Sequence, residues 1–178
     1  MLEGELYIAA DTQLTSERQR ARQLIREYNK IPEDQVRERA ALLKKLIPHS
    51  RAKLEIQPPF YCDYVSNIVL GDNVFFNFNC VILDVSRVTI GNRCLFGPAV
   101  QIYTATHPMD HEQRATGLEF GKSVTIGDDV WVGGNVTICP GVTIGDRTVI
   151  GSGSVVTKNI PPHVFAAGNP CRVIRELE

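Results

Sequence analysis

Residues 126–160 read IGDDVW-VGGNVT-ICPGVT-IGDRTV-IGSGSV-VTKNI, and residues six apart along this stretch have the same character. The first position of each unit is a β-branched aliphatic residue: Ile126, Val132, Ile138, Ile144, Ile150 and Val156. The second position is glycine at 127, 133, 145 and 151. The fifth position is small or β-branched: Val130, Val136, Val142, Thr148, Ser154 and Ile160. A period of six matches neither an α-helix nor the strict alternation of a half-buried strand.

Such a repeat is typical of a solenoid of short parallel strands, in which each unit forms one flat side and a corner. The aliphatic first residue points inward and stacks on its equivalent one coil away. Glycine and polar residues after it form the corner, where unusual backbone angles are needed. Because one unit cannot bury its own apolar face, the stack is the core. The sequence therefore predicts a mainly β protein, a parallel β-helix.

Length and charge limit the function classes. With 178 residues and a net charge of −1, the chain fits one domain, or one domain with an appendage. The balanced charge gives no electrostatic case for binding nucleic acid or a membrane surface. No apolar run approaches the ~20 residues that span a bilayer, and the first residues do not resemble a secretory signal. An odd number of cysteines without a Cys-x-x-Cys pair suggests buried thiols. We expect a cytoplasmic protein.

The repeat divides the chain into three segments. Residues 1–57 lack hexads, and their periodicity predicts two helices packed on an open end or side of the solenoid. The first contains Ala21 and Tyr28 on its apolar face, with Thr15 and Ser16 as possible caps; the second follows Pro32 with Val36 on its apolar face. Residues 58–162 form the β-helix, and residues 163–178 form a C-terminal tail apolar enough to pack as a strand.

The solenoid is interrupted at residues 104–123, which fit no hexad. Loops on rigid scaffolds often carry function, and His107 lies at the start of this one. An imidazole with a reference pKa of about 6.5 can take a proton from a hydroxyl at neutral pH. His111 raises a metal alternative, but His49 and His163 lie far away in sequence, so we expect no metal site.

Polar residues of the earlier coils could bind a polyhydroxylated ligand, because carboxylates and amides form hydrogen bonds of defined geometry. The candidates are Asp63, Asn77, Asp84 and, at the far end of the loop, Glu119. Arg18 and Asp11 lie in the N-terminal segment, which could close over such a site.

A second set of candidates could bind a long cofactor. Lys158, Arg172 and Arg175 lie near the C-terminal end, where they would suit phosphate groups. Trp131 takes an outward position and could contact a neighbouring subunit or a ligand.

Several motifs together resemble the maltose and galactoside O-acetyltransferases, nearly end to end. They are GELY at 4–7, NFN at 77–79, YTATHP at 103–108, GG at 133–134 and GNPCRVI at 168–174. This resemblance implies a left-handed parallel β-helix, acetyl-CoA as the donor, and a homotrimer with active sites between subunits.

The resemblance also implies roles for individual residues. His107 would be the general base that deprotonates a sugar hydroxyl, which then attacks the thioester directly in a ternary complex. The backbone N–H of Gly134 would bind the oxyanion. Asp63, Asn77 and Phe75 match acceptor-binding positions. The CoA groove would be lined by Gly134, Ser152, Thr157, Lys158, Arg172 and Arg175.

Departures from the galactoside enzymes favour a maltose or glucose acceptor. Phe75 replaces a tyrosine and Val85 replaces an aspartate, while the N-terminal carboxylate is shifted to Asp11. Glu119 lies in a stretch closer to the maltose type, and we expect it to orient or charge His107. Two alternatives stay open: the same chemistry on a galactoside, oligosaccharide or antibiotic, and a non-catalytic trimeric scaffold. A scaffold would need neither His107 nor the basic set, so both favour the enzyme.

Overall fold

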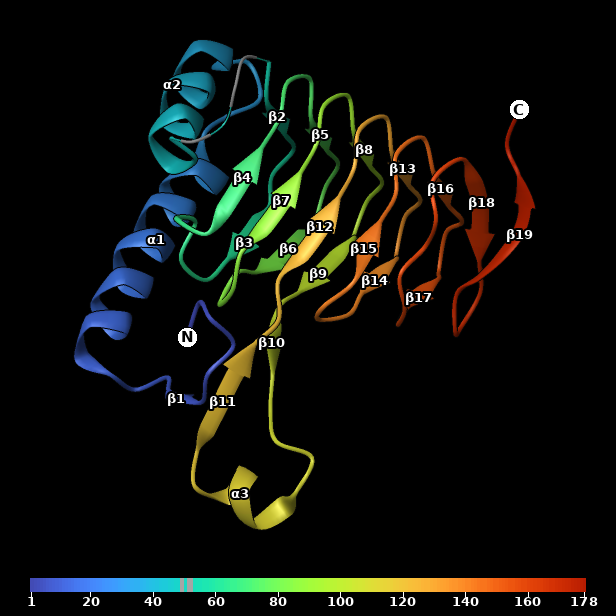
Figure 1. Cartoon of the computed structure of the whole chain (residues 1–178). Helices are drawn as coiled ribbons and strands as arrows, with labels where there is room; N and C mark the ends of the chain where they lie inside the picture. The colour runs from blue at the N-terminus through green and yellow to red at the C-terminus, as the bar shows by residue number, and fades with distance from the viewer. Residues whose placement is uncertain (49, 51–52) are drawn as a thin grey trace.

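The computed structural model describes residues 1–48, 50 and 53–178, so His49 lies outside the described residues. Successive strands return to the same three sheets, coil after coil (Figure 1). The first sheet holds β2 (Glu55–Ile56), β5 (Phe75–Phe76), β8 (Leu95–Phe96), β13 (Trp131–Val132), β16 (Val149–Ile150), β18 (Val164–Ala167) and β19 (Arg172–Glu176). The second holds β3 (Phe60–Cys62), β6 (Cys80–Leu83), β9 (Gln101–Tyr103), β14 (Thr137–Ile138) and β17 (Val155–Val156). The third holds β4 (Ile68–Leu70), β7 (Val88–Ile90), β12 (Val124–Ile126) and β15 (Thr143–Ile144).

The interior of the stack confirms the predicted hexads. The aliphatic first positions are buried, and Ile126, Val132 and Ile138 each pair in parallel with the equivalent residue one coil later, as Val132 does with Ile150. The fifth positions are buried as well, including the polar Thr148 and Ser154. In the earlier coils the inward column contains aromatic rings, with Phe76 stacked on Phe96 at a centroid distance of 4.3 Å. The core is therefore one continuous apolar column.

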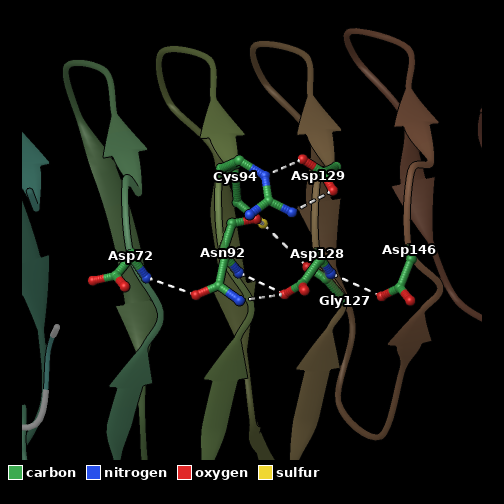
Figure 2. Close-up of polar contacts among 8 residues, drawn as sticks. Asp72, Asn92, Cys94, Gly127, Asp128, Asp129 and Asp146 are labelled. Carbon is green, nitrogen blue, oxygen red and sulfur yellow. Dashed lines mark hydrogen bonds and ion pairs between the residues drawn. The ribbon is translucent and has the colours of Figure 1, made fainter. Parts of the chain in front are cut away.

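The corners explain the glycine at the second position of the hexad. Figure 2 shows a ladder in which the side chain of each corner residue accepts the backbone N–H of the equivalent residue one coil earlier. The members are Asp72, Asn92, Asp128 and Asp146, with N···O distances of 2.9, 2.7 and 2.8 Å. A Cβ at Gly127 would lie 2.1 Å from Asp146 Oδ1. Only glycine leaves room for this ladder.

Two helices cover one end of the stack, as predicted (Figure 1). α1 (Thr12–Lys30) is held to the first coil by Asn29, which exchanges two 2.9 Å hydrogen bonds with the backbone of Phe60. The expected caps were wrong: Asp11 Oδ1 accepts the first free N–H groups, so Thr15 and Ser16 lie inside the helix.

The second helix, α2 (Val36–Leu46), differs in one respect from the predicted apolar face. Val36 is 66% exposed, whereas Leu43 and Leu46 are buried.

At the other end of the stack, β18 continues the solenoid past residue 162 and β19 pairs with it antiparallel. In the described residues no helix is both long and apolar enough to cross a membrane.

The interruption at 104–123 is an ordered arm. β10 (Ala105–Thr106) and β11 (Leu118–Gly121) form an antiparallel pair, and α3 (His111–Ala115) lies between them. The N-terminal strand β1 (Tyr7–Ile8) pairs with the free edge of β11. Figure 1 shows the arm projecting from the side of the stack, with β1 alongside it. The N-terminal segment and the arm therefore form one small sheet.

Candidate active site

The arm brings His107 and Glu119 together at its base. His107 follows β10, Glu119 lies on β11, and His107 Nε2 is 3.7 Å from Glu119 Oε2. The imidazole is 56% exposed and the carboxylate only 16% exposed. One ring nitrogen faces a carboxylate while the ring stays open to a ligand. A carboxylate in this place stabilises the imidazolium that forms when the histidine accepts a proton.

The N-terminal segment supplies a further contact that the sequence did not suggest. Tyr7 lies opposite Glu119 in the β1–β11 pair, and its hydroxyl donates to Glu119 Oε1 at 2.7 Å. Burial, followed by the hydrogen bond to Glu119, raises the pKa of Tyr7. The phenol therefore remains a donor at all pH values near neutrality.

Asp63 lies directly after β3, close to this cluster. Its carboxylate is 14% exposed and accepts from Arg22 at 3.1 Å. Arg22, Asp63 and Tyr61 line a groove of about 320 Å³ between α1 and the second sheet. A carboxylate and an aromatic ring in an open groove suit a sugar ring. Arg22 was not singled out from the sequence, because one arginine in a charged helix carries no distinguishing pattern.

Arg18 makes its contacts within the chain. Its guanidinium donates to the Tyr64 hydroxyl at 2.7 Å and to the Ala9 carbonyl at 2.6 Å. These bonds tie the N-terminal segment to the first coil, beside Asp63. Asp11, for its part, caps α1 through its side-chain oxygen.

Asp84 occupies a different kind of place from the one expected of a ligand contact. Its side chain is fully buried, and Oδ1 accepts the backbone N–H groups of Asp63 and Tyr64, each at 2.9 Å. Burial raises its pKa to about 6, against the opposing effect of those two hydrogen bonds. With no exposed surface, Asp84 supports the backbone that carries Asp63 instead of touching a ligand.

Phe75 lies on β5 of the first sheet, and Asn77 lies in the corner that follows this strand. Asn77 follows β5, is half-buried, and its side-chain oxygen accepts the N–H of Phe78 at 2.8 Å. Asn79 has a φ of 61°, so it is a corner residue. Outward-facing apolar residues in register form a row on this sheet, which we call the apolar row: Phe75, Leu95, Trp131, Val149 and Phe165. Trp131 is 56% exposed at its centre.

The expected cofactor residues lie in the later coils and the tail. At the corner after β13, the backbone N–H groups of Gly133 and Asn135 donate hydrogen bonds to backbone carbonyls. Within the described part of the chain, the N–H of Gly134 donates to no backbone carbonyl. Ser152 and Thr157 follow β16 and β17 and are exposed.

Three cations accompany them. Lys158 lies in the last corner and Arg172 and Arg175 lie on β19, all exposed. Within the described residues, none of the three forms a salt bridge. They are available to an anionic ligand. No cluster of residues able to hold a metal ion occurs in the described ranges.

Comparisons with known proteins identify the family of the chain. Residues 1–51 match the maltose acetyltransferase hexapeptide capping motif, and residues 123–158 match the bacterial transferase hexapeptide (six repeats). Nodulation protein L of Rhizobium meliloti is 47% identical, over 97% of this chain and 94% of its own. A maltose O-acetyltransferase from Clostridium difficile has a TM-score of 0.97 and 47% identity, covering 99% of this chain and 95% of its own.

A galactoside acetyltransferase solved in complex with coenzyme A has a TM-score of 0.96 and 43% identity, covering 99% of this chain and 88% of its own. The chain belongs to the maltose and galactoside O-acetyltransferase family. It is therefore an acetyltransferase built on the hexapeptide-repeat β-helix, as the sequence motifs predicted. For a member of this family, the exposed cations and the unused N–H of Gly134 are in keeping with a coenzyme A donor.

Proposed function

We propose that this protein transfers the acetyl group of acetyl-CoA to a hydroxyl of a sugar, of the maltose or glucose type. The observation that carries the proposal is the exposed imidazole of His107 facing the carboxylate of Glu119 at the base of the arm. Asp63 beside it and the groove lined by Tyr61 offer contacts for a sugar ring. Phe75 lacks the hydroxyl of a tyrosine, which favours a glucosyl over a galactoside acceptor.

In the proposed mechanism, the acceptor and acetyl-CoA are bound together. His107 takes the proton of the sugar hydroxyl, and the oxygen attacks the thioester carbonyl. The negative charge of the tetrahedral intermediate lies on the former carbonyl oxygen, which the Gly134 N–H would stabilise. Collapse breaks the C–S bond, and the imidazolium returns its proton to the departing thiolate. Asp63 and Asn77 hold the acceptor, and Asp84 fixes the backbone beneath Asp63.

The donor would lie along the later coils. Lys158, Arg172 and Arg175 would contact the phosphates of CoA, and Ser152, Thr157 and Gly134 would contact the pantetheine chain or the acetyl group. Because these residues lie in the later coils and His107 at the base of the arm, we propose that the site forms between neighbouring subunits of a homotrimer. The exposed apolar row with Trp131 at its centre would be covered in that assembly.

The function is tested by following the free thiol released from acetyl-CoA with maltose, glucose, galactosides, a chitin-type oligosaccharide and an aminoglycoside. We expect release that depends on maltose or glucose and falls by at least ~10³-fold in His107→Ala. His111→Ala, on α3 of the same arm, is the matched control and should retain activity. Preference for the oligosaccharide would change the proposed acceptor and leave the proposed chemistry unchanged. No release and no CoA binding would indicate a scaffold.

The assembly is tested separately by sedimentation. A trimer is expected, and Trp131→Ser should weaken it, because the substitution removes the largest side chain of the apolar row. A fully active monomer would contradict the shared site.

A further inference from the structure

Three side chains lie in a row across the small sheet of the arm. Tyr7 on β1 faces Glu119 on β11, and its hydroxyl donates to Oε1 at 2.7 Å. The other oxygen of the same carboxylate, Oε2, lies 3.7 Å from His107 Nε2. Glu119 is therefore held by one oxygen and faces the imidazole with the other.

We propose that Tyr7 is a positioning residue for His107, acting through Glu119. The phenol fixes the carboxylate so that Oε2 stays directed at the imidazole during proton transfer. This inference rests on the proposed function, because it concerns the step in which His107 accepts the acceptor proton. It also gives the N-terminal segment a part in the reaction beyond covering the end of the solenoid.

The physical reason is that the side chain of Glu119 is flexible and must be held in one position to act on His107. A glutamate side chain loses considerable rotamer freedom when it is held in one place, and a displacement of about 1 Å near reacting groups can cost ~10²-fold in rate. The hydrogen bond from Tyr7 holds the carboxylate in one place. A carboxylate held there stabilises the imidazolium on His107.

Other charged and titratable groups surround the row without replacing this bond. Asp63 and Tyr64, from the first coil, lie close enough to Tyr7 for their charges to add to the rise in its pKa. The guanidinium of Arg18 is hydrogen-bonded to Tyr64. Among the described residues, the hydrogen bond that Glu119 receives on its side chain comes from Tyr7.

A double-mutant cycle on kcat tests the inference. Tyr7→Phe should lower kcat roughly ten-fold while the KM for acetyl-CoA is unchanged. In the Glu119→Gln background, the same Tyr7→Phe change should alter kcat by less than about two-fold, because the carboxylate that Tyr7 orients is already absent, although the glutamine oxygen can still accept from the phenol. Equal effects in both backgrounds, or no effect in either, would overturn the inference.

The matched control is Tyr28→Phe. This tyrosine also joins the N-terminal segment to the solenoid by a phenol hydrogen bond, to the Ile56 carbonyl, but on the end of α1 remote from β1. It should lower thermal stability without changing kcat. If Tyr28→Phe lowers kcat as much as Tyr7→Phe, the effect of Tyr7 is general loosening and the inference fails.

A second readout does not need turnover. The imidazole of His107 is titrated by NMR in the wild type, Tyr7→Phe, Glu119→Gln and the double variant, with His107→Ala to assign its signal. A pKa change caused by Tyr7→Phe only when Glu119 is present supports the inference, and the absence of any such coupling overturns it. If His107→Ala keeps full transferase activity, the proposed function fails, and this titration still decides whether Tyr7 acts through Glu119.

Discussion

Asp84 gives the sharpest stability prediction, because it is a buried carboxylate with a raised pKa. Burial moves its pKa from an ordinary 3.8 to about 6. The folded state therefore keeps a proton that the unfolded chain releases between these two values. Stability from this group is present below pH 3.8, declines as the pH rises, and is lost above pH 6. One pKa unit corresponds to ~1.4 kcal/mol, so the loss amounts to about 3 kcal/mol.

The perturbation is Asp84→Asn. The amide keeps an oxygen that can accept the N–H groups of Asp63 and Tyr64, but it cannot ionise. Burying the NH₂ group of the asparagine costs the same free energy at every pH. This cost therefore does not affect how the difference in stability between the variant and wild type changes with pH. Relative to wild type, the variant should therefore gain roughly 2.5 kcal/mol between pH 4 and pH 8, since a small part of the total is already present at pH 4.

The assay is urea denaturation at a fixed protein concentration and constant ionic strength, from pH 4 to pH 8. Asp128→Asn is the control: hydrogen bonds from the backbone and then the side chain of Asn92 lower the pKa of Asp128 below 3.8, so its contribution is lost only as the pH falls below that value, and its difference from wild type should stay nearly flat from pH 4 to pH 8. A difference between Asp84→Asn and wild type that stays flat across this range, as that of Asp128→Asn should, or that favours wild type as the pH rises, would refute the reasoning.

Three further outcomes are expected. Gly127→Ala should destabilise the fold by about 3 kcal/mol in denaturation experiments, because its Cβ would lie 2.1 Å from Asp146 Oδ1; a neutral result would mean that the corner ladder is dispensable. Arg172→Ala should raise the KM for acetyl-CoA roughly ten-fold with kcat nearly constant, and high salt should shrink this difference; an unchanged KM would remove Arg172 from the phosphate site. Phe75→Tyr should raise kcat/KM for galactosides relative to maltose several-fold, about 1 kcal/mol; equal changes for both would place Phe75 outside the acceptor pocket.

The hexads made most of the solenoid predictable, because burial of an aliphatic residue every six positions is a local property of the chain. From Ile126 to Val156 each expected inward side chain is buried. Polarity was a weaker guide. Asp84 looked like a ligand contact, but a carboxylate can also be buried to hold backbone N–H groups, and sequence alone does not separate the two.

The sequence showed where the arm lies, but it did not predict which strands pair within it. The pairing of Tyr7 with Glu119 joins positions 112 residues apart, and no period connects them. The N-terminal cap was missed for a related reason: Asp11 was considered for a binding role, while Thr15 and Ser16 were equally plausible caps by residue type. The motif around Tyr7 was noticed only as part of a family resemblance, without a partner for its hydroxyl.

The arm leaves the solenoid without disturbing the stacking on either side. Ile90 pairs with Ile126 and Ile126 pairs with Ile144, so the coil that carries the arm uses twice as many residues as the next one. Antiparallel strands bring the chain back to where it left, and the parallel register resumes unchanged. A corner of this solenoid therefore works as an insertion point, at which a long segment can be added without altering the stacked core on either side.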